Sequence, residues 1–379
     1  MKPGGSGESI HCVIGRDGLQ ELIDTLIVDG HTVIAPRLTD GALVLSKIAR
    51  VDDLPAGVSD DQGAGRYRLS QDGDGSLFAF ASTAQGWKRY LYPPVERMWQ
   101  ARRDGAGFSI VAESLPTPRY AFLGVRACDL KAIGVLDRVF DHSKSAEPRY
   151  VARREQCLII AVNCTRAGGT CFCTSMDSGP RVGDGADIVL TEFRTDDGAA
   201  FLGQGRSARG KAYVAKLTSR PASAAEVTAA DARIDAAAAA MKRTMPSDTA
   251  AVLRRNLEHR NWAEIATRCL GCANCTMVCP TCFCGTIEDS TDLAGEVAER
   301  TRKWDSCFTG DFSYIHGGSI RRSTASRYRQ WITHKLSHWW EQFGCSGCVG
   351  CGRCITWCPV GIDITEEVHK IKNSEGGAR

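Results

Sequence analysis

The sequence lacks the features that would place a chain in a membrane or outside the cell. Among its 379 residues, no stretch approaches the roughly 18 consecutive apolar residues that a membrane span needs. Its first residues are polar and rich in glycine and serine, without the charged start, apolar stretch and cleavage site of a secretory signal. We therefore expect a soluble, cytoplasmic protein with no membrane partner.

Charge of one sign is also scarce. The 47 Lys and Arg residues and the 44 Asp and Glu residues leave a formal net charge of +3. This charge is too small for a protein whose main partner is a polyanion, so we expect no nucleic-acid partner.

Signals of catalysis are missing as well. The sequence offers no clear pair of nucleophile and general base. Its one loose dinucleotide fingerprint, at 203–208, has no strong strand before it and no clean helix after it. A turn is the expected structure there, and the chain is not expected to be a catalyst by itself.

Cysteine, in contrast, is abundant. There are 18 cysteines in the chain, and most of them lie after residue 268. Cysteines that cluster at metal-ligand spacing in a large chain without a secretory signal indicate metal thiolates in a reducing compartment, rather than disulfides.

Two copies of one cysteine spacing dominate the C-terminal part. They are Cys269-x2-Cys272-x2-Cys275-x3-Cys279-Pro280 and Cys348-x2-Cys351-x2-Cys354-x3-Cys358-Pro359. In this spacing three cysteines surround one cuboidal [4Fe-4S] cluster, and the fourth reaches the other cluster of a two-cluster ferredoxin. Zinc is the alternative, but its cysteine ligands usually come as two separated pairs. The two runs therefore predict two [4Fe-4S] clusters held by these eight cysteines.

The part of the chain before these runs alternates between strand and helix patterns. Buried strands are expected at 120–125, 157–162 and 188–192, and an amphipathic helix at 130–140. The predicted fold is an α/β N-terminal domain plus an α-helical two-cluster ferredoxin-like C-terminal domain. The expected divisions are a disordered tail at 1–10, the α/β domain at 11–220, a helical linker at 221–246 and the helical dicluster domain at 247–370, with a helix at 247–268 and another at 321–343.

Four further cysteines follow strands of the α/β domain. They are Cys128, Cys164, Cys171 and Cys173. If the strands at 120–125 and 157–162 are neighbours, these thiols meet at the carboxyl edge of the sheet, where open α/β sheets place their sites. Our hypothesis is a third [4Fe-4S] cluster, with the carboxylate of Asp129 able to replace one thiolate. The alternative is that these cysteines are small buried hydrophobic residues.

The remaining cysteines do not follow the ferredoxin spacing. Cys282, Cys284 and Cys307 lie near the first run and are expected to donate weak S–H bonds around the ferredoxin clusters; the alternative is a further cluster completed by Cys345. Cys12 and Cys157 are expected to be inert core residues.

Basic and aromatic residues gather between 302 and 340. They are Arg302, Lys303, Arg321, Arg322, Arg327, Arg329 and Lys335, with Trp304, Tyr314, Tyr328, Trp331, Trp339 and Trp340. Such a mixture can bind nucleic acid. Because the aromatic residues recur at helical spacing, core or partner contact is favoured, and we expect a docking surface for another subunit.

Five motifs of the chain occur together in one known family. They are Phe122-Leu-Gly-Val-Arg-Ala-Cys-Asp-Leu-Lys-Ala-Ile-Gly-Val-Leu-Asp137, Asn163-Cys164 with Cys171-Phe-Cys-Thr-Ser-Met176, Cys279-Pro-Thr-Cys-Phe-Cys284, Trp304-Asp-Ser-Cys307, and Gly347-Cys-Val-Gly-Cys-Gly-Arg-Cys-Ile-Thr-Trp-Cys-Pro-Val-Gly-Ile-Asp363. With these motifs the chain resembles the iron–sulfur β subunit of soluble group 3b nickel–iron hydrogenases, also called sulfhydrogenases. The resemblance spans about residues 15–370. The A subunit of anaerobic sulfite reductase is similar.

This resemblance implies a non-catalytic electron-transfer subunit of an NAD(P)-linked oxidoreductase. It implies that the chain relays single electrons between a flavin subunit that binds NAD(P)H and the small and large subunits of a nickel–iron hydrogenase. A flavin takes a two-electron hydride and releases single electrons, which clusters can carry. Two alternatives stay open: a relay in anaerobic sulfite reductase, and an iron–sulfur protein that binds nucleic acid, which the net charge disfavours.

Overall fold

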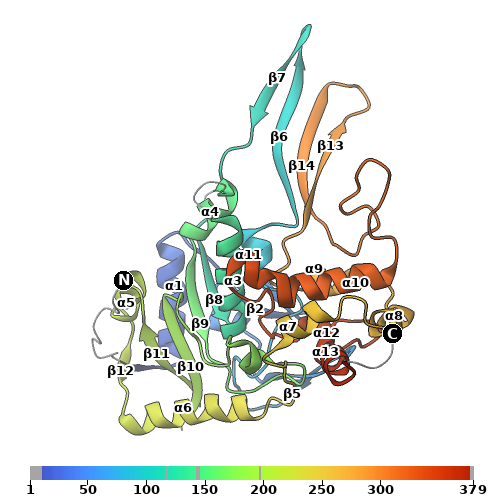
Figure 1. Cartoon of the computed structure of the whole chain (residues 1–379). Coiled ribbons are helices and arrows are strands. Elements are labelled where there is room, and N and C mark those ends of the chain that lie inside the picture. The colour runs from blue at the N-terminus through green and yellow to red at the C-terminus, as the bar shows by residue number, and fades with distance from the viewer. Residues whose placement is uncertain (1–10, 117, 142–145, 196–197, 376–379) are drawn as a thin grey trace.

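The computed structural model describes residues 11–116, 118–141, 146–195 and 198–375. The tail predicted at 1–10 lies outside these ranges. Figure 1 shows a body built on a large sheet, a helical C-terminal region packed beside it, and a narrow sheet that projects beyond both.

The body is organised around an eight-stranded sheet with the strand order β12-β1-β11-β10-β9-β8-β2-β3. Its central strands run parallel and are β2 (Thr32–Thr39), β8 (Tyr120–Val125), β9 (Leu158–Val162) and β10 (Ile188–Thr195). Antiparallel strands complete the two edges and are β3 (Ala42–Lys47), β11 (Gly198–Gly205), β1 (Cys12–Ile14) and β12 (Ser219–Pro221). The prediction of an α/β region with strands at these places is confirmed.

Helices cover both faces of this sheet. Ala121 and Leu123 of β8 belong to one buried cluster with α1 (Arg16–Val28), whereas Phe122 between them belongs to another with α3 (Ala127–Phe140). This alternation follows from the two-residue repeat of a strand, and burial on both faces explains the continuous apolar runs of the central strands. The other helices of the body are α2 (Lys88–Leu91), α4 (Pro148–Glu155) and α5 (Ala208–Val214).

The glycines of the loose dinucleotide fingerprint do not form the predicted turn. Gly203 and Gly205 lie in β11, which pairs antiparallel with β10. A Cβ atom on Gly205 would lie 2.6 Å from the Cα atom of Lys211 in α5. This glycine therefore serves the close packing of α5 on its own strand.

The predicted linker is helical over part of its length. Helix α6 covers Ala224–Ala239 and begins with a reciprocal capping box: Ser223 N donates to Glu226 Oε2 at 2.9 Å, and Glu226 N donates to Ser223 Oγ at 3.3 Å. Its residue Ala230 packs in a small buried cluster with β10 and β11, so the helix also covers the sheet.

The helix predicted at 247–268 is two helices, α7 (Thr249–Arg255) and α8 (Asn261–Arg268). Asn256 separates them, because its side-chain amide donates to Val252 O at 2.8 Å and closes the first helix. The second helix ends directly at the first cysteine run.

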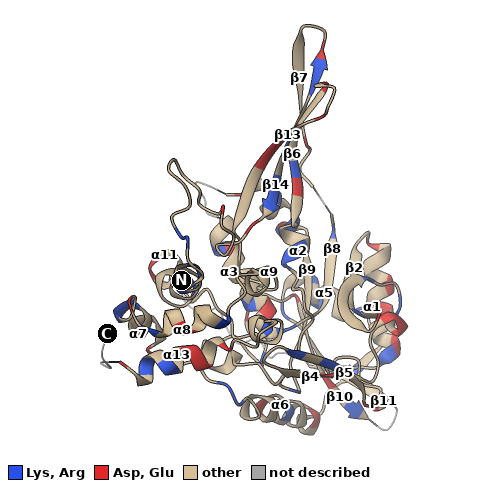
Figure 2. Ribbon diagram, turned by 90° about the vertical axis from the view of Figure 1, so that its right-hand side faces the viewer, with Lys and Arg blue, Asp and Glu red and all other residues tan. Residues whose placement is uncertain are grey.

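The projecting sheet combines two hairpins that are far apart in the sequence. It has the order β13-β14-β6-β7, with β6 (Val95–Asp104), β7 (Gly107–Ala112), β13 (Gly285–Thr291) and β14 (Val297–Trp304). Acidic and basic residues lie along its strands β6, β13 and β14 (Figure 2). At its base the buried carboxylate of Glu96 contacts Arg302 of the neighbouring strand β14 and Arg153 of α4, and the pair with Arg153 anchors the sheet to the body. The sequence patterns do not predict this sheet.

Short helices make up the rest of the C-terminal region. They are α9 (Asn274–Met277), α10 (Thr324–Thr333), a π-helical turn at His334–His338, α11 (Trp339–Phe343), α12 (Arg353–Thr356) and α13 (Ile364–Asn373). The hairpin of β4 (Val58–Gly63) and β5 (Arg66–Gln71) packs against α12. Every described helix is too short or too polar to cross a membrane.

Three of the six aromatic residues expected to form a docking surface are core residues. Tyr328, Trp331 and Trp339 are only 2%, 4% and 2% exposed, whereas Trp340 and Tyr314 are exposed. The expectation of a docking surface is therefore wrong for the three buried rings, because their helical spacing turns them toward the interior of the C-terminal region.

Candidate metal centres

The two cysteine runs share one backbone conformation. Gly271 and Gly350, at equivalent positions, have φ angles of +63° and +62°, and the next equivalent pair, Ala273 and Gly352, has +65° and +75°. Each run then enters a four-residue helix, α9 or α12. Two left-handed residues in a row of five curl the chain so that its cysteines point toward one region.

The first three cysteines of run one share a cavity with the last cysteine of run two. One cavity is bordered by Cys269, Cys272, Cys275 and Cys358, together with Cys354 of run two. We call Cys269, Cys272, Cys275 and Cys358 the first site, because Cys354 belongs with its own run in the ferredoxin spacing. Burial is the main cause of the raised pKa of Cys275, and the neighbouring charges of Cys269 and Cys358 add to it.

The second set of thiols combines the first three cysteines of run two with the last cysteine of run one. We call Cys348, Cys351, Cys354 and Cys279 the second site. Burial raises the pKa of each of the three run-two thiols, and in each case Cys279 lies close enough to contribute. The fourth cysteine of each run thus lies with the other run, as the two-cluster ferredoxin pattern predicts.

Two buried hydrogen-bond donors beside the first site have no partner among the described residues. They are the Tyr328 hydroxyl and the Trp331 indole N–H, and both side chains border the cavity. Buried donors normally find an acceptor. Sulfur atoms of a [4Fe-4S] cluster in the cavity would supply acceptors, so the residues present fit such a group.

The thiol arrangement does not suit a single metal ion. Within the described part of the chain, no group of three or more His, Cys, Asp or Glu side chains is placed to hold one ion. The cysteines are present as free thiols rather than disulfides. Thiols that surround a cavity without converging on one point favour a multi-iron cluster over zinc.

The four cysteines of the α/β domain come together at one edge of the sheet. Strands β8 and β9 are parallel neighbours, so Cys128 and Cys164, which follow them, lie at the same edge. Burial is the main cause of the raised pKa of Cys173, and Cys171 and Cys164 contribute; Cys173 in turn contributes to the raised pKa of Cys128. We call these four residues the α/β site. Their metal ligation stays a prediction.

The α/β site lies directly against the second cysteine run. Phe172 N donates to Gly350 O at 2.9 Å, and Ser178 Oγ donates to Val349 O at 2.5 Å. A Cβ atom on Gly350 would lie 2.7 Å from the carbonyl carbon of Phe172, so only glycine fits this approach. The charge of Cys351 adds to the burial that raises the pKa of Cys173.

Asp129 does not take the role of a replacement ligand. Both of its carboxylate oxygens accept hydrogen bonds from Arg353, at 2.8 and 2.9 Å, and Arg353 Nε donates to Thr83 O at 2.8 Å. All three contacts are buried. The carboxylate is therefore committed to an ion pair that joins the α/β domain to the second cysteine run.

The other cysteines fall into two groups. Cys12 and Cys157 are buried in the sheet, as predicted. Cys282, Cys284 and Cys307 gather beside the second site, with the thiol of Cys282 in contact with Cys279 and the thiol of Cys284 in contact with Cys307. Cys345 packs against the buried cluster of Trp339 and Val349, which also includes Cys128, Cys173 and Cys351.

Sequence reasoning missed two buried lysines. Lys88 and Lys335 are 5% and 4% exposed. Lys335 Nζ donates to Thr281 Oγ1 at 2.8 Å and to Gly347 O at 2.9 Å, between the two cysteine runs. Helical spacing from Tyr328 and Trp331 was the available signal, since residues three and seven positions apart lie on one face.

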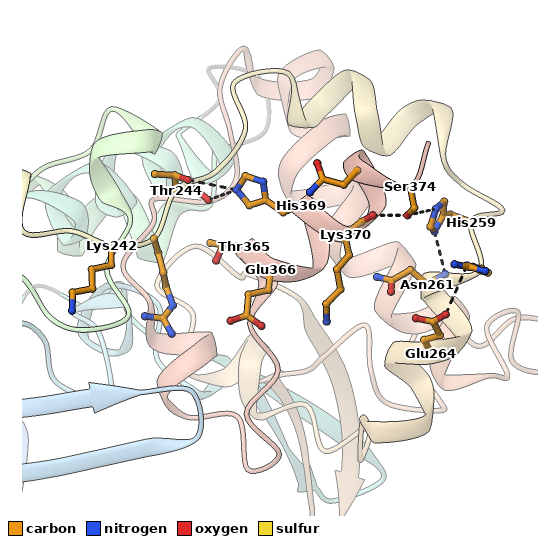
Figure 3. Close-up of a pocket in the computed structure, with 13 residues that line it drawn as sticks. Lys242, Thr244, His259, Asn261, Glu264, Thr365, Glu366, His369, Lys370 and Ser374 are labelled. Carbon is orange, nitrogen blue, oxygen red and sulfur yellow. Dashed lines mark hydrogen bonds and ion pairs between the residues drawn. The ribbon is translucent and has the colours of Figure 1, made fainter. Parts of the chain in front are cut away.

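A large polar hollow lies elsewhere on the surface, away from the cysteine sites. It lies between α8, α13 and the segment after α6 (Figure 3), and none of its lining residues is a cysteine. His369 Nε2 lies 3.1 Å from Thr244 O, and His259 Nε2 lies 3.2 Å from Ser374 Oγ. These hydrogen bonds tie α13 to its neighbours.

Similarity to known proteins agrees with this geometry. Residues 268–362 match the family described as 4Fe-4S dicluster domain. The C-terminal region is therefore a dicluster domain that binds [4Fe-4S] clusters, and the chain has an iron–sulfur electron-transfer role.

The chain is also similar in sequence to the protein named "Sulfhydrogenase 2 subunit beta" of Pyrococcus furiosus. The two chains are 29% identical over 292 residues, which cover 75% of this chain and 82% of the relative. The chain is thus a homologue of a sulfhydrogenase β subunit, and the resemblance read from its motifs is confirmed.

Proposed function

We propose that the chain is the electron-relay subunit of a cytoplasmic complex with a nickel–iron hydrogenase module. In this proposal it receives single electrons from a flavin subunit that binds NAD(P)H and delivers them to the small and large hydrogenase subunits, or carries them in the reverse direction. The bond-breaking chemistry takes place in those partners. A homologue named as a subunit of a sulfhydrogenase supports the proposal.

The single observation that carries the proposal is the adjacency of three thiol groups. The first and second sites exchange their fourth cysteines, Cys358 and Cys279. The second and α/β sites meet where Phe172 N donates to Gly350 O. A row of neighbouring thiol groups suits electron transfer by successive single-electron steps.

The residues of the three sites would hold one cluster each. The first site would use Cys269, Cys272, Cys275 and Cys358; the second Cys348, Cys351, Cys354 and Cys279; and the α/β site Cys128, Cys164, Cys171 and Cys173. When bound, the clusters supply one-electron redox chemistry. The protein chain excludes water from the sites, since most of these thiols are buried or half-buried.

Anaerobic purification of the tagged chain from its native host tests the proposal. We expect nickel, flavin and hydrogenase subunits to co-purify, and NAD(P)H to reduce the clusters only when the flavin subunit is present. Sirohaem in place of nickel would identify the sulfite reductase alternative, and bound nucleic acid the third. The relay function would be wrong if the isolated chain oxidised hydrogen or reduced sulfite by itself.

A further inference from the structure

Three cysteines that the relay does not use lie together at the base of the projecting sheet. Cys282 and Cys284 directly precede β13, and Cys307 follows β14. Asp305, just past β14, donates its backbone N–H to Cys284 O at 2.9 Å. The hairpin therefore fixes Cys284 beside Cys307, and their thiols are in contact.

Cys282 joins this pair to the second site. Its thiol contacts that of Cys279, and this contact, then burial and the nearby charge of Cys284, raise its pKa. Three thiols from two chain segments thus lie next to one another, beyond the four cysteines of the first run.

Two buried lysine side chains face the same thiols. Lys88 Nζ donates to Cys282 O at 2.8 Å and lies 3.8 Å from the ring centre of Trp304, a cation–π contact. Lys335 Nζ donates to Thr281 Oγ1 and Gly347 O. All of these hydrogen-bond acceptors are neutral, and the thiols are the nearby groups that could carry a negative charge.

Lys88 and Lys335 also suit thiols that bind iron. Thiolates bound to iron keep their negative charge at neutral pH and would compensate an ammonium group beside them.

One side of the thiol group opens to the surface. Cys284 and Cys307 border a hollow of about 530 Å³, which is also bordered by Arg302, Arg321 and His334. Three thiolates can hold three irons of a cluster, while a fourth position remains on the side of the hollow.

We propose that Cys282, Cys284 and Cys307 bind a further iron–sulfur cluster through three thiolates, on the outer side of the second site and at the base of the projecting sheet. Each thiol releases its proton to solvent when its sulfur binds iron. The proposal adds a redox centre to the chain and does not depend on the identity of the partner subunits.

The first test counts iron and sulfide in the full chain, purified anaerobically. The double variant Cys284→Ser/Cys307→Ser should lose about three to four irons and about four sulfides per chain relative to the natural sequence. The matched control Cys12→Ser should lose none, because this thiol lies in β1 of the large sheet and donates to Gly203 O. An unchanged iron content in a folded double variant would overturn the proposal.

The second test uses the unmodified protein, so that it does not depend on the folding of a variant. Iodoacetamide is added anaerobically, and alkylated cysteines are located by mass spectrometry. Free thiols beside an open hollow would react, whereas iron-bound thiolates are protected. We expect Cys284 and Cys307 to react only after the iron has been removed by a chelator and an oxidant. Alkylation of both in the iron-loaded protein would refute the site.

Discussion

The charge of Lys335 should set the redox potential of the second site. Its ammonium Nζ lies 2.8 Å from Thr281 Oγ1, which itself lies 3.2 Å from Cys279 Sγ. Burial acts to lower the pKa of Lys335, but the negative charges of Cys279 and Cys282 outweigh it and raise the pKa. The side chain is therefore an ammonium group at neutral pH, and its charge stabilises the added electron of a reduced cluster.

The expected size of this effect follows from the geometry. Two successive contacts place the ammonium within roughly 6 Å of the Cys279 sulfur, and thus roughly 7 Å from the electron spread over a cluster. At an effective dielectric constant of about 20, two unit charges at this distance interact by about 2.4 kcal/mol. That free energy is a factor of roughly 50 in the reduction equilibrium, or about 100 mV for one electron.

The variant Lys335→Met removes the charge and keeps the length of the side chain. We expect the midpoint potential of one cluster to fall by about 100 mV in a redox titration followed by EPR. Lys335→Arg should retain most of the potential. Lys372→Met is the matched control, because Lys372 lies at the surface in an ion pair with Asp248. If Lys335→Met shifted no potential more than the control does, at unchanged iron content, the electrostatic reasoning would be refuted.

Two further predictions test the crossover of the runs and their packing on the α/β domain. The double variant Cys272→Ser/Cys358→Ser should lose one cluster, as either single variant does, because both cysteines belong to the first site. The double variant Cys272→Ser/Cys279→Ser should lose two clusters, because Cys279 belongs to the second site. Equal iron counts for the two double variants would contradict the exchange of fourth cysteines. Gly352→Ala should lower the free energy of unfolding by about 3 kcal/mol, because the φ angle of Gly352 is positive and an added Cβ atom would lie 2.4 Å from a backbone oxygen. The control Gly295→Ala, at a glycine with positive φ in open space, should lower it by only about 1 kcal/mol. Equal midpoints in denaturant titrations of the two iron-loaded variants would show that the close contact at Gly352 costs nothing.

The positions of the α/β thiols could be predicted because the signals are local. An apolar run followed by Cys128, and another followed by Cys164, identify two strands and their carboxyl ends. The one unknown was whether the strands are neighbours, and β8 and β9 do pair in parallel. Strand adjacency is a tertiary property, which the sequence pattern alone leaves open.

The projecting sheet could not be predicted for the same reason. Its strands β6 and β14 pair Arg302 with Glu96, a register that joins residues about two hundred positions apart. Strand β7 is exposed along its whole length, so it lacks the alternation of apolar and polar burial that marks a half-buried strand. The buried ion pair between Glu96 and Arg153 of α4 connects the base of the sheet to the body, and Trp304 at the end of β14 packs against the buried cluster of α3.

The helix face that carries Tyr328, Trp331 and Lys335 should make the reduction potentials of the first and second sites differ. The first two residues present neutral donors to the first site, and the third brings a full positive charge to the second, from within a π-helical turn of the kind that recurs at functional sites. A full charge stabilises an added electron more than neutral donors do. The second site should therefore have the higher potential of the two. It also adjoins the α/β site through Gly350, so electrons that enter from either neighbour would collect at this central position before they leave.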